Sequence, residues 1–283
     1  MKRDLPRVVV FLLGLLAASV AGWLVLGHPE WIASMAVVTA MLAIALLWIY
    51  RRIPRLLRGL YRAQQFQTWQ QIQSLLSLSS VLHITHPLPP MRGAAILPDL
   101  ANVLLSLILE RKPGLVLEAG SGVSTLIIAY ALRRVGKGRL ISLEHGPTFF
   151  AHTATNLEKH GLTDVAAVVH APLKTVTIDG TRWRWYDTAA LSTAKPIDLL
   201  FIDGPPANTQ NLARYPALPL LIAKLSEDAV ILLDDVNRDD ERTILRMWTA
   251  QFPDFKLELV ETFKKAAILR RTVGRASRGV DRD

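Results

Sequence analysis

The chain has 283 residues, of which 51% are hydrophobic; it carries a formal net charge of +9 and contains no cysteine. The missing cysteine excludes disulfides, thiol catalysis and cysteine metal sites. The basic excess lies at the two ends, since residues 1–62 hold eight basic and two acidic side chains and residues 264–283 hold seven and two. Because the remaining middle is slightly acidic, the charge pattern argues against a nucleic-acid-binding body.

Two uncharged hydrophobic runs occupy most of the first fifty residues, at about 8–27 and 31–50. Each has about the 20 residues that a helix needs to cross a bilayer. Basic residues flank both outer ends, so the positive-inside rule places both ends of the pair in the cytoplasm. Residues 1–52 are therefore predicted to form a hairpin of two transmembrane helices, with the catalytic domain and both termini cytoplasmic. A cleaved signal peptide is the rival interpretation.

Residues 53–90 are predicted to form a connector between this anchor and the body of the protein. Apolar residues recur at helical spacing as far as Leu78, after an arginine-rich start that suits anionic lipid headgroups. A proline-rich loop, Thr85–Gly93, then marks a domain boundary. At the other end of the chain, residues 273–283 read as a basic, flexible tail.

The body, residues 91–272, alternates short apolar runs with helix-compatible segments. This alternation predicts an α/β fold with a doubly wound, mostly parallel, Rossmann-like sheet of seven strands. The last two strands follow each other without a helix, so the final strand is expected to run antiparallel. A hairpin is expected to turn at Asp179-Gly180. Strands of the main sheet are expected at residues 114–120, 139–145, 165–171, 197–204 and 229–235.

The stretch LVLEAGSGVST, Leu115–Thr125, reads as a buried strand, a glycine turn and the start of a helix. Gly120 and Gly122 let the backbone turn sharply and approach a ligand. A dinucleotide fingerprint would need a third glycine where Thr125 stands. Glu118 before the turn would repel phosphates and suits a cationic group, such as an α-ammonium group, instead.

A second carboxylate, Glu144, ends the next strand about twenty residues later, where an acidic residue accepts hydrogen bonds from ribose hydroxyls. A ribose joined to an amino acid without phosphates describes S-adenosylmethionine. In the alternative interpretation, Glu118 and Glu144 are merely carboxylates in solvent at strand ends.

Four segments, LEAGSGVST, LISLEHGP, IDLLFIDGPP and ILLDD, resemble in order the motifs of class I S-adenosylmethionine-dependent methyltransferases. The resemblance covers roughly Met91 to Thr272. It implies that the glycine turn follows the methionine part of the cofactor, that Glu144 binds the ribose and that His145 packs on the adenine. The cofactor-binding residues implied in this way are Glu118, Gly120, Ser121, Gly122, Ser124, Glu144, His145, His170, Ala171 and Asp203.

Three aspartates, Asp203, Asp234 and Asp235, end two strands that this fold places side by side. Their carboxylates are expected to converge, which suits Mg²⁺ or another divalent cation. The segments are distantly similar to catechol- and caffeoyl-CoA-type O-methyltransferases, although the catalytic lysine of the catechol type would fall on Pro206. The alternative is that Asp203 positions a ligand and Asp235 caps a helix.

The acceptor site is the least defined part of the sequence. Asp203 and Asp235 are candidate catalytic bases, with His86 a further candidate. Arg214, Tyr215 and Tyr186 are expected to face the acceptor, although a structural salt bridge is an equal alternative for Arg214.

The leading hypothesis is a membrane-anchored methyltransferase that acts on a small-molecule, lipid-linked or glycan-linked acceptor. The alternatives are a non-catalytic, cofactor-binding membrane scaffold and an NAD-dependent oxidoreductase on a similar fold. The oligomeric state is left open.

Overall fold

The computed structural model describes residues 14, 17, 20–22, 29–191 and 195–272. The chain divides into two compact units, Met1–Thr68 and Trp69–Asp283. Most of the predicted first membrane span and the predicted tail at 273–283 lie outside the described residues.

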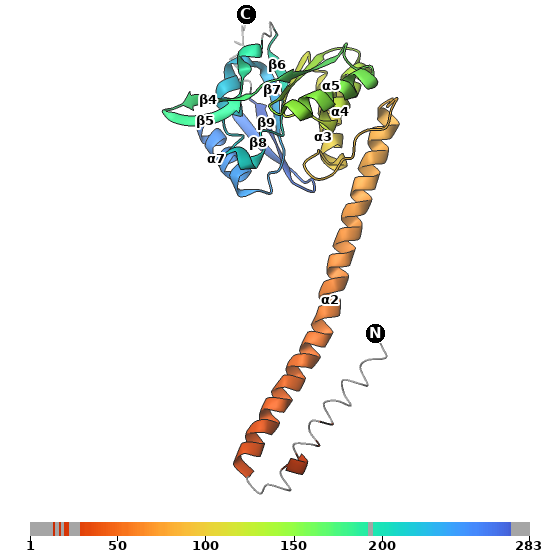
Figure 1. Ribbon diagram of the computed structural model, residues 1–283, viewed down its shortest axis with the longest axis vertical. Coiled ribbons are helices and arrows are strands. Elements are labelled where there is room, and N and C mark those ends of the chain that lie inside the picture. Colours follow the sequence, from red (N-terminus) through yellow and green to blue (C-terminus); the bar gives the residue numbers. More distant parts are fainter. Residues whose placement is uncertain (1–13, 15–16, 18–19, 23–28, 192–194, 273–283) are drawn as a thin grey trace, which may run out of the picture. The chain divides into compact units, whose positions relative to one another are not determined.

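One long helix, α2 (Pro29–Val81), replaces the predicted second membrane span and connector helix (Figure 1). The helix runs without a break from the predicted span into the predicted connector, through Pro54. Its portion Met35–Val81 is long and apolar enough, by length and composition alone, to cross a membrane. Large apolar side chains such as Met41, Ile44 and Leu60 are about two-thirds exposed. Two membrane helices are therefore not seen among the described residues; one exposed helix is.

The second unit is built on a seven-stranded sheet in the order β3-β2-β1-β6-β7-β9-β8. Neighbours from β3 to β7 pair in parallel, whereas β9 runs antiparallel to both β7 and β8. The predicted Rossmann-like sheet and its reversed last strand are confirmed. The strands are β1 (Leu115–Ala119), β2 (Arg139–Glu144), β3 (Ala166–His170), β6 (Ile197–Ile202), β7 (Leu225–Leu233), β8 (Phe255–Val260) and β9 (Ala266–Arg271).

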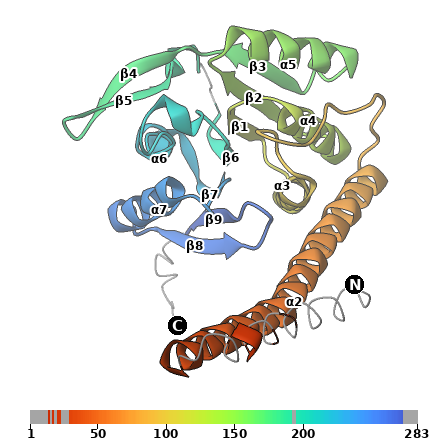
Figure 2. The same cartoon turned by 60° about the horizontal axis from the view of Figure 1, so that its bottom comes forward.

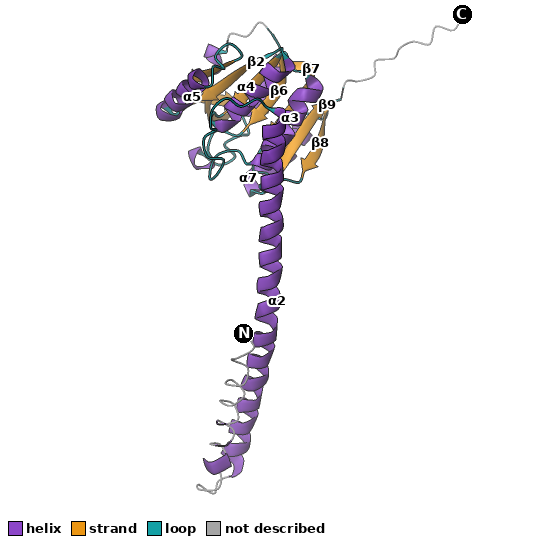
Figure 3. Cartoon of the chain, turned by 90° about the vertical axis from the view of Figure 1, so that its right-hand side faces the viewer, coloured by secondary structure: helices purple, strands orange, loops and turns teal. Residues whose placement is uncertain are grey.

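Helices cover both faces of this sheet (Figures 2 and 3). Successive strand residues point to opposite faces, so Val116 of β1 packs in one hydrophobic cluster and Leu117 in the other. One cluster includes residues of α3 and α4, and the other includes residues of α6 and α7. The helices are α3 (Pro98–Arg111), α4 (Val123–Val135), α5 (Pro147–Lys159), α6 (Ala217–Leu221) and α7 (Asp239–Gln251).

A β-hairpin and a short helix add detail to the predicted fold. Strands β4 (Leu173–Ile178) and β5 (Thr181–Tyr186) form a separate hairpin. Asp179 and Gly180 both have positive φ, as a two-residue type I′ turn requires. Helix α6 is short and gives way to a 3₁₀ turn at Ile222–Lys224.

The strand order reverses direction between β1 and β6. From β1 the chain fills the sheet outward through β2 and β3, and from β6 it continues through β7. In open α/β sheets, ligands bind outside the carboxyl ends of the strands at such a switch point. Gly120 follows β1 and Asp203 follows β6, so both stand at this position.

Candidate functional site

The glycine turn after β1 is backbone that only glycine adopts easily. Gly120 has φ +106° and its N–H bonds Leu143 O at 3.0 Å. A side chain there would come within 3.3 Å of the Asp203 backbone. Gly122, at the N-terminus of α4, has φ +155°, and a Cβ there would meet nothing within 4 Å. The first glycine is thus needed for close packing, and the second leaves open space in front of a helix N-terminus.

Glu118 lies inside the protein and is not in solvent. Its side chain is completely buried and accepts hydrogen bonds from Ser124, from Thr125 at 2.7 Å and from Ser142. Burial raises the pKa of Glu118 to about 7, against the lowering effect of these three hydroxyls. Glu118 therefore connects the end of β1 to α4 and β2 through buried hydrogen bonds. The interpretation of Glu118 as an exposed carboxylate at a strand end is wrong.

The raised pKa of Glu118 predicts a pH-dependent stability. Because the folded protein holds this proton more tightly than the unfolded chain, the free energy of unfolding falls as pH rises from about 4.5 to about 7. Glu118→Gln is expected to remove about 3 kcal/mol of this fall. Urea unfolding at about pH 5 and about pH 8 measures it, with the exposed Glu110→Gln as control. An equal change in the free energy of unfolding between the two pH values for wild type and Glu118→Gln would contradict the prediction.

Glu144 stands at the end of β2, almost completely buried, with both carboxylate oxygens turned to the loop region. Ser121 Oγ donates to one oxygen at 2.9 Å, and the backbone N–H of Gly146 donates to the other at 2.8 Å. His145 Nδ1 lies 3.2 Å from the same carboxylate. A carboxylate has about four acceptor positions, so Glu144 retains capacity for further donors such as two hydroxyls.

A cavity of about 140 Å³ opens at this edge between the ends of β1, β2 and β6. It is smaller than the roughly 300 Å³ of common ligand sites, so a larger ligand would extend beyond it. The structure brings seven of the predicted site residues to this cavity. They are Gly120, Ser121, Ser124, Glu144, His145, Tyr186 and Asp203.

Four further residues line the cavity: Ala94, Phe149, Gly204 and Pro206; the last three were absent from the predicted site. A sequence signal could have found Phe149, because it is a large apolar residue in the first turn of a helix that follows a strand end. In the structure its side chain is 63% exposed. Nearby, the rings of Phe150 and His170 lie 5.5 Å apart. His170 is exposed and lies outside the cavity lining, as does the buried Ala171.

Tyr186, the last residue of β5, lines the cavity. Its side chain is buried, and burial raises its pKa well above the usual value for tyrosine. A Cβ on Gly204 would come within 2.2 Å of the Tyr186 hydroxyl. The hydroxyl therefore reaches the backbone at the Asp203 turn.

We expect Gly204→Ala to lower the free energy of unfolding by about 1–3 kcal/mol, because the added methyl meets the Tyr186 hydroxyl. Tyr186→Phe in the same chain removes that hydroxyl and is expected to restore part of the loss. Chemical denaturation of the two single variants and the double variant forms the cycle. Strict additivity of the single effects would show that the two groups do not meet.

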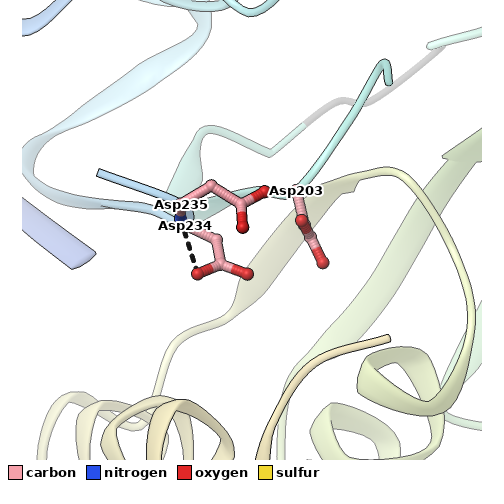
Figure 4. A group of neighbouring side chains, drawn as sticks. All are labelled: Asp203, Asp234 and Asp235. Carbon is pink, nitrogen blue, oxygen red and sulfur yellow. Dashed lines mark hydrogen bonds between the residues drawn. The ribbon is translucent and has the colours of Figure 1, made fainter. Parts of the chain in front are cut away.

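The predicted convergence of Asp203, Asp234 and Asp235 is confirmed. One ligand oxygen from each lies within 4.8 Å of the others, and Figure 4 shows the three side chains gathered at the ends of β6 and β7. Burial raises the pKa of Asp203 to about 8, partly opposed by Arg214 and reinforced by Asp234 and Asp235. A carboxyl group that titrates near neutral pH beside the cavity has the protonation behaviour of a general base.

Arg214 and Tyr215 do not line the cavity. The guanidinium of Arg214 is buried and bonds Asp235 at 2.8 Å and Asp203 at 3.1 Å, which matches the salt-bridge alternative. The hydroxyl of Tyr215 donates to Gln251 at 3.0 Å, and its ring packs on Trp183. An acceptor-facing role for either residue stays a prediction without geometric support.

Most residues of this cavity lie in a segment that matches a known protein family. Residues 117–236 match the family model described as a methyltransferase domain. The chain carries an S-adenosylmethionine-dependent methyltransferase domain. No curated protein matches the sequence.

Two solved structures share the fold of the methyltransferase domain. A methyltransferase from Podospora anserina, determined with SAH bound, superposes with a TM-score of 0.51 at 16% identity, covering 76% of this chain and 95% of that one. An O-methyltransferase from Klebsiella pneumoniae, itself described as putative, gives a TM-score of 0.50 at 18% identity, covering 71% and 89%.

The described residues fit S-adenosylmethionine at this edge. Open space at Gly122 faces the N-terminus of α4, which favours a carboxylate. Glu144 retains acceptor capacity for the ribose, and Phe149 offers an exposed ring beyond it. The divalent cation fits less well, because Arg214 already binds two of the three aspartates. The metal stays a prediction.

Proposed function

We propose that the domain transfers a methyl group from S-adenosylmethionine to a hydroxyl group of a small-molecule acceptor, either free or linked to a lipid or glycan. The observation that carries this proposal is the single cavity shared by the glycine turn, Glu144 and Asp203. When bound, the cofactor supplies an electrophilic methyl group on its sulfonium. The likeness to one solved structure, described as a putative O-methyltransferase, supports an oxygen acceptor.

The residues of this chain would contribute positioning and proton removal. Glu144 and the glycine turn hold the cofactor at the ends of β1 and β2, which aligns donor and acceptor. Asp203 stands at the end of β6 on the same cavity and takes the proton of the acceptor hydroxyl. The acceptor oxygen then bonds the methyl carbon, and the carbon–sulfur bond breaks with its electron pair remaining on sulfur. Burial of Tyr186 and Gly204 limits water at this point.

Thr125 argues against the dinucleotide alternative. Its hydroxyl donates a hydrogen bond to Glu118 and accepts one from the backbone N–H of Gly122 at 3.0 Å. The third position of the fingerprint therefore holds a hydrogen-bonded side chain where a dinucleotide site needs glycine for close packing.

Calorimetric titration of the full-length chain with S-adenosylmethionine, and separately with NAD⁺, tests the cofactor. We expect binding of the first and none of the second. Methyl-labelled cofactor incubated with soluble and lipid extracts then tests turnover, and label in the organic phase would identify a lipid-linked acceptor. Cofactor binding without label transfer to any extract would favour the non-catalytic scaffold, and NAD⁺ binding would favour the oxidoreductase.

We further propose that α2 anchors the protein in a membrane with the methyltransferase domain on the cytoplasmic side. The exposed apolar side chains of α2 and the basic residues Arg51, Arg52 and Arg55 support this placement. Because the chain has no cysteine, a single introduced cysteine reports its own location. Lys137→Cys, on an exposed turn, should react with an impermeant maleimide only in permeabilised cells. Labelling in intact cells would contradict the cytoplasmic placement.

A further inference from the structure

The carboxylates at the ends of β6 and β7 belong to a larger ionic cluster. Asp203, Asp234 and Asp235 are joined by Glu241 from α7, which is 2% exposed. A metal-dependent site would leave the space between such oxygens for a cation surrounded by several oxygen ligands. The described residues instead place a protein cation among them.

That cation is the guanidinium of Arg214. One terminal nitrogen lies 2.8 Å from Asp235 Oδ2 and 3.1 Å from Asp203 Oδ1, so it bridges the ends of two strands. The other terminal nitrogen donates to the backbone oxygen of Asp234 at 2.9 Å. The Arg214 side chain is 4% exposed. Arginine suits this place because its planar fork presents several donors in fixed directions.

The loop that carries Arg214 is itself held in position. Leu212 has φ +52°, and its N–H donates to Asp240 of α7 at 2.9 Å. Trp248 of α7 donates to the backbone oxygen of Tyr215 at 3.0 Å. The segment on both sides of Arg214 is therefore fixed to α7, and the guanidinium enters the cluster from a fixed backbone.

Two more cations complete the charge balance on Asp235. Arg238 lies 2.9 Å from Asp235 Oδ2, and Lys264 lies 3.7 Å from Asp235 Oδ1. Among the described residues of this cluster, three basic side chains thus face four carboxylates. A divalent ion entering here would have to displace Arg214 from two aspartates and would meet repulsion from all three cations.

We propose that Arg214 is the resident cation of this cluster, that it takes the place of a divalent metal ion, and that the methyltransferase domain binds no such ion there. The guanidinium fixes Asp203 against the end of β7, which sets the position of that carboxylate beside the cavity. Whether an ion binds at this cluster does not depend on the acceptor or on turnover.

The carboxylate of Asp234 has few protein partners, so it could bind a cation if Arg214 were replaced. Asp234 Oδ2 is buried without a hydrogen-bond partner among the described residues, and Asp234 Oδ1 accepts only the N–H of Asp235. If Arg214 were removed, oxygens of three aspartates within 4.8 Å of one another would remain, with Arg238 and Lys264 beside Asp235 alone. Such a set of oxygens is the kind of site that a divalent cation occupies.

The test measures Mn²⁺ binding to the full-length chain after a chelator has removed bound metal. Binding is read as loss of the free-ion signal in electron paramagnetic resonance. Wild type is expected to bind no Mn²⁺ at millimolar concentration. Arg214→Met is expected to bind one ion per chain, with an affinity at least about tenfold above the detection limit of the wild-type titration. Adding Asp235→Asn to Arg214→Met should remove that binding, and Arg214→Lys, which keeps the charge, should resemble wild type.

Stoichiometric Mn²⁺ binding by wild type that Asp235→Asn abolishes would overturn the proposal. So would a folded Arg214→Met that binds no ion. If Arg214→Met does not fold, the wild-type measurement decides alone. Failure of S-adenosylmethionine to bind would count against the proposed function and leave this result unaffected, because the titrations use the metal alone.

Discussion

Replacing Arg214 with methionine is expected to destabilise the methyltransferase domain by about 3–5 kcal/mol. The substitution keeps most of the side-chain volume but removes the cation that pairs with Asp203, Asp235 and Glu241. The loss is large because the carboxylates stay buried, and Asp203 loses its ion-pair partner while Asp235, among the described residues, keeps only Arg238 and Lys264. Chemical denaturation followed by tryptophan fluorescence measures it, and the midpoint temperature should fall by about 10 °C or more.

Arg133→Met is the matched control, because Arg133 also pairs with an aspartate, Asp164, but with 40% of its side chain exposed. An exposed pair contributes about 0–1 kcal/mol, so this variant should be nearly as stable as wild type. Adding Asp203→Asn to Arg214→Met should recover part of the loss, since Arg214 is the only ion-pair partner of Asp203 among the described residues. Equal losses for Arg214→Met and Arg133→Met would show that the buried cluster has no special role in stability.

Glu144→Ala is expected to weaken S-adenosylmethionine binding at least tenfold, about 1.4 kcal/mol. Two effects act together. The variant loses the carboxylate that we propose as the ribose ligand, and it releases Ser121 and the N–H of Gly146, which Glu144 now holds at 2.9 and 2.8 Å. Isothermal titration of the full-length chain gives the dissociation constant.

Two comparisons separate these effects. Glu144→Gln keeps an acceptor for Ser121 or Gly146 but loses the charge, so its affinity should fall between wild type and Glu144→Ala. Glu158→Ala, on the exposed side of α5, changes the net charge equally and should bind like wild type. Unchanged affinity in a folded Glu144→Ala would place the ribose elsewhere.

The sheet and the cofactor edge could be predicted because their causes are local in the sequence. Apolar runs ending in Gly120, Glu144 and Asp203 indicate buried strands and the residues that follow them. In a parallel sheet, those ends necessarily meet at one edge. The side chains at strand ends were therefore placed correctly without knowledge of any side-chain contact.

The direction in which a side chain points could not be read in the same way. Glu118 reads as a ligand-facing carboxylate, yet Ser142, its neighbour across the ladder to β2, draws it into the interior. Arg214 lies in a loop whose path depends on contacts with α7, far along the chain. Such placements depend on packing between distant segments, for which a single sequence gives no periodic signal.

The hydrogen-bonded ladder of the sheet extends one residue beyond the strands, into the site. The N–H of Gly120 bonds Leu143 O, that of Ala171 bonds Glu144 O, that of Asp203 bonds Ala119 O, and that of Asp234 bonds Ile202 O. Amide exchange at these positions should therefore be as slow as in the core, since it requires opening of the sheet itself. Local fluctuations would move only the loops beyond them. Rigid geometry at the strand ends and freedom to vary the loops beyond them thus reside in adjacent residues of the same chain.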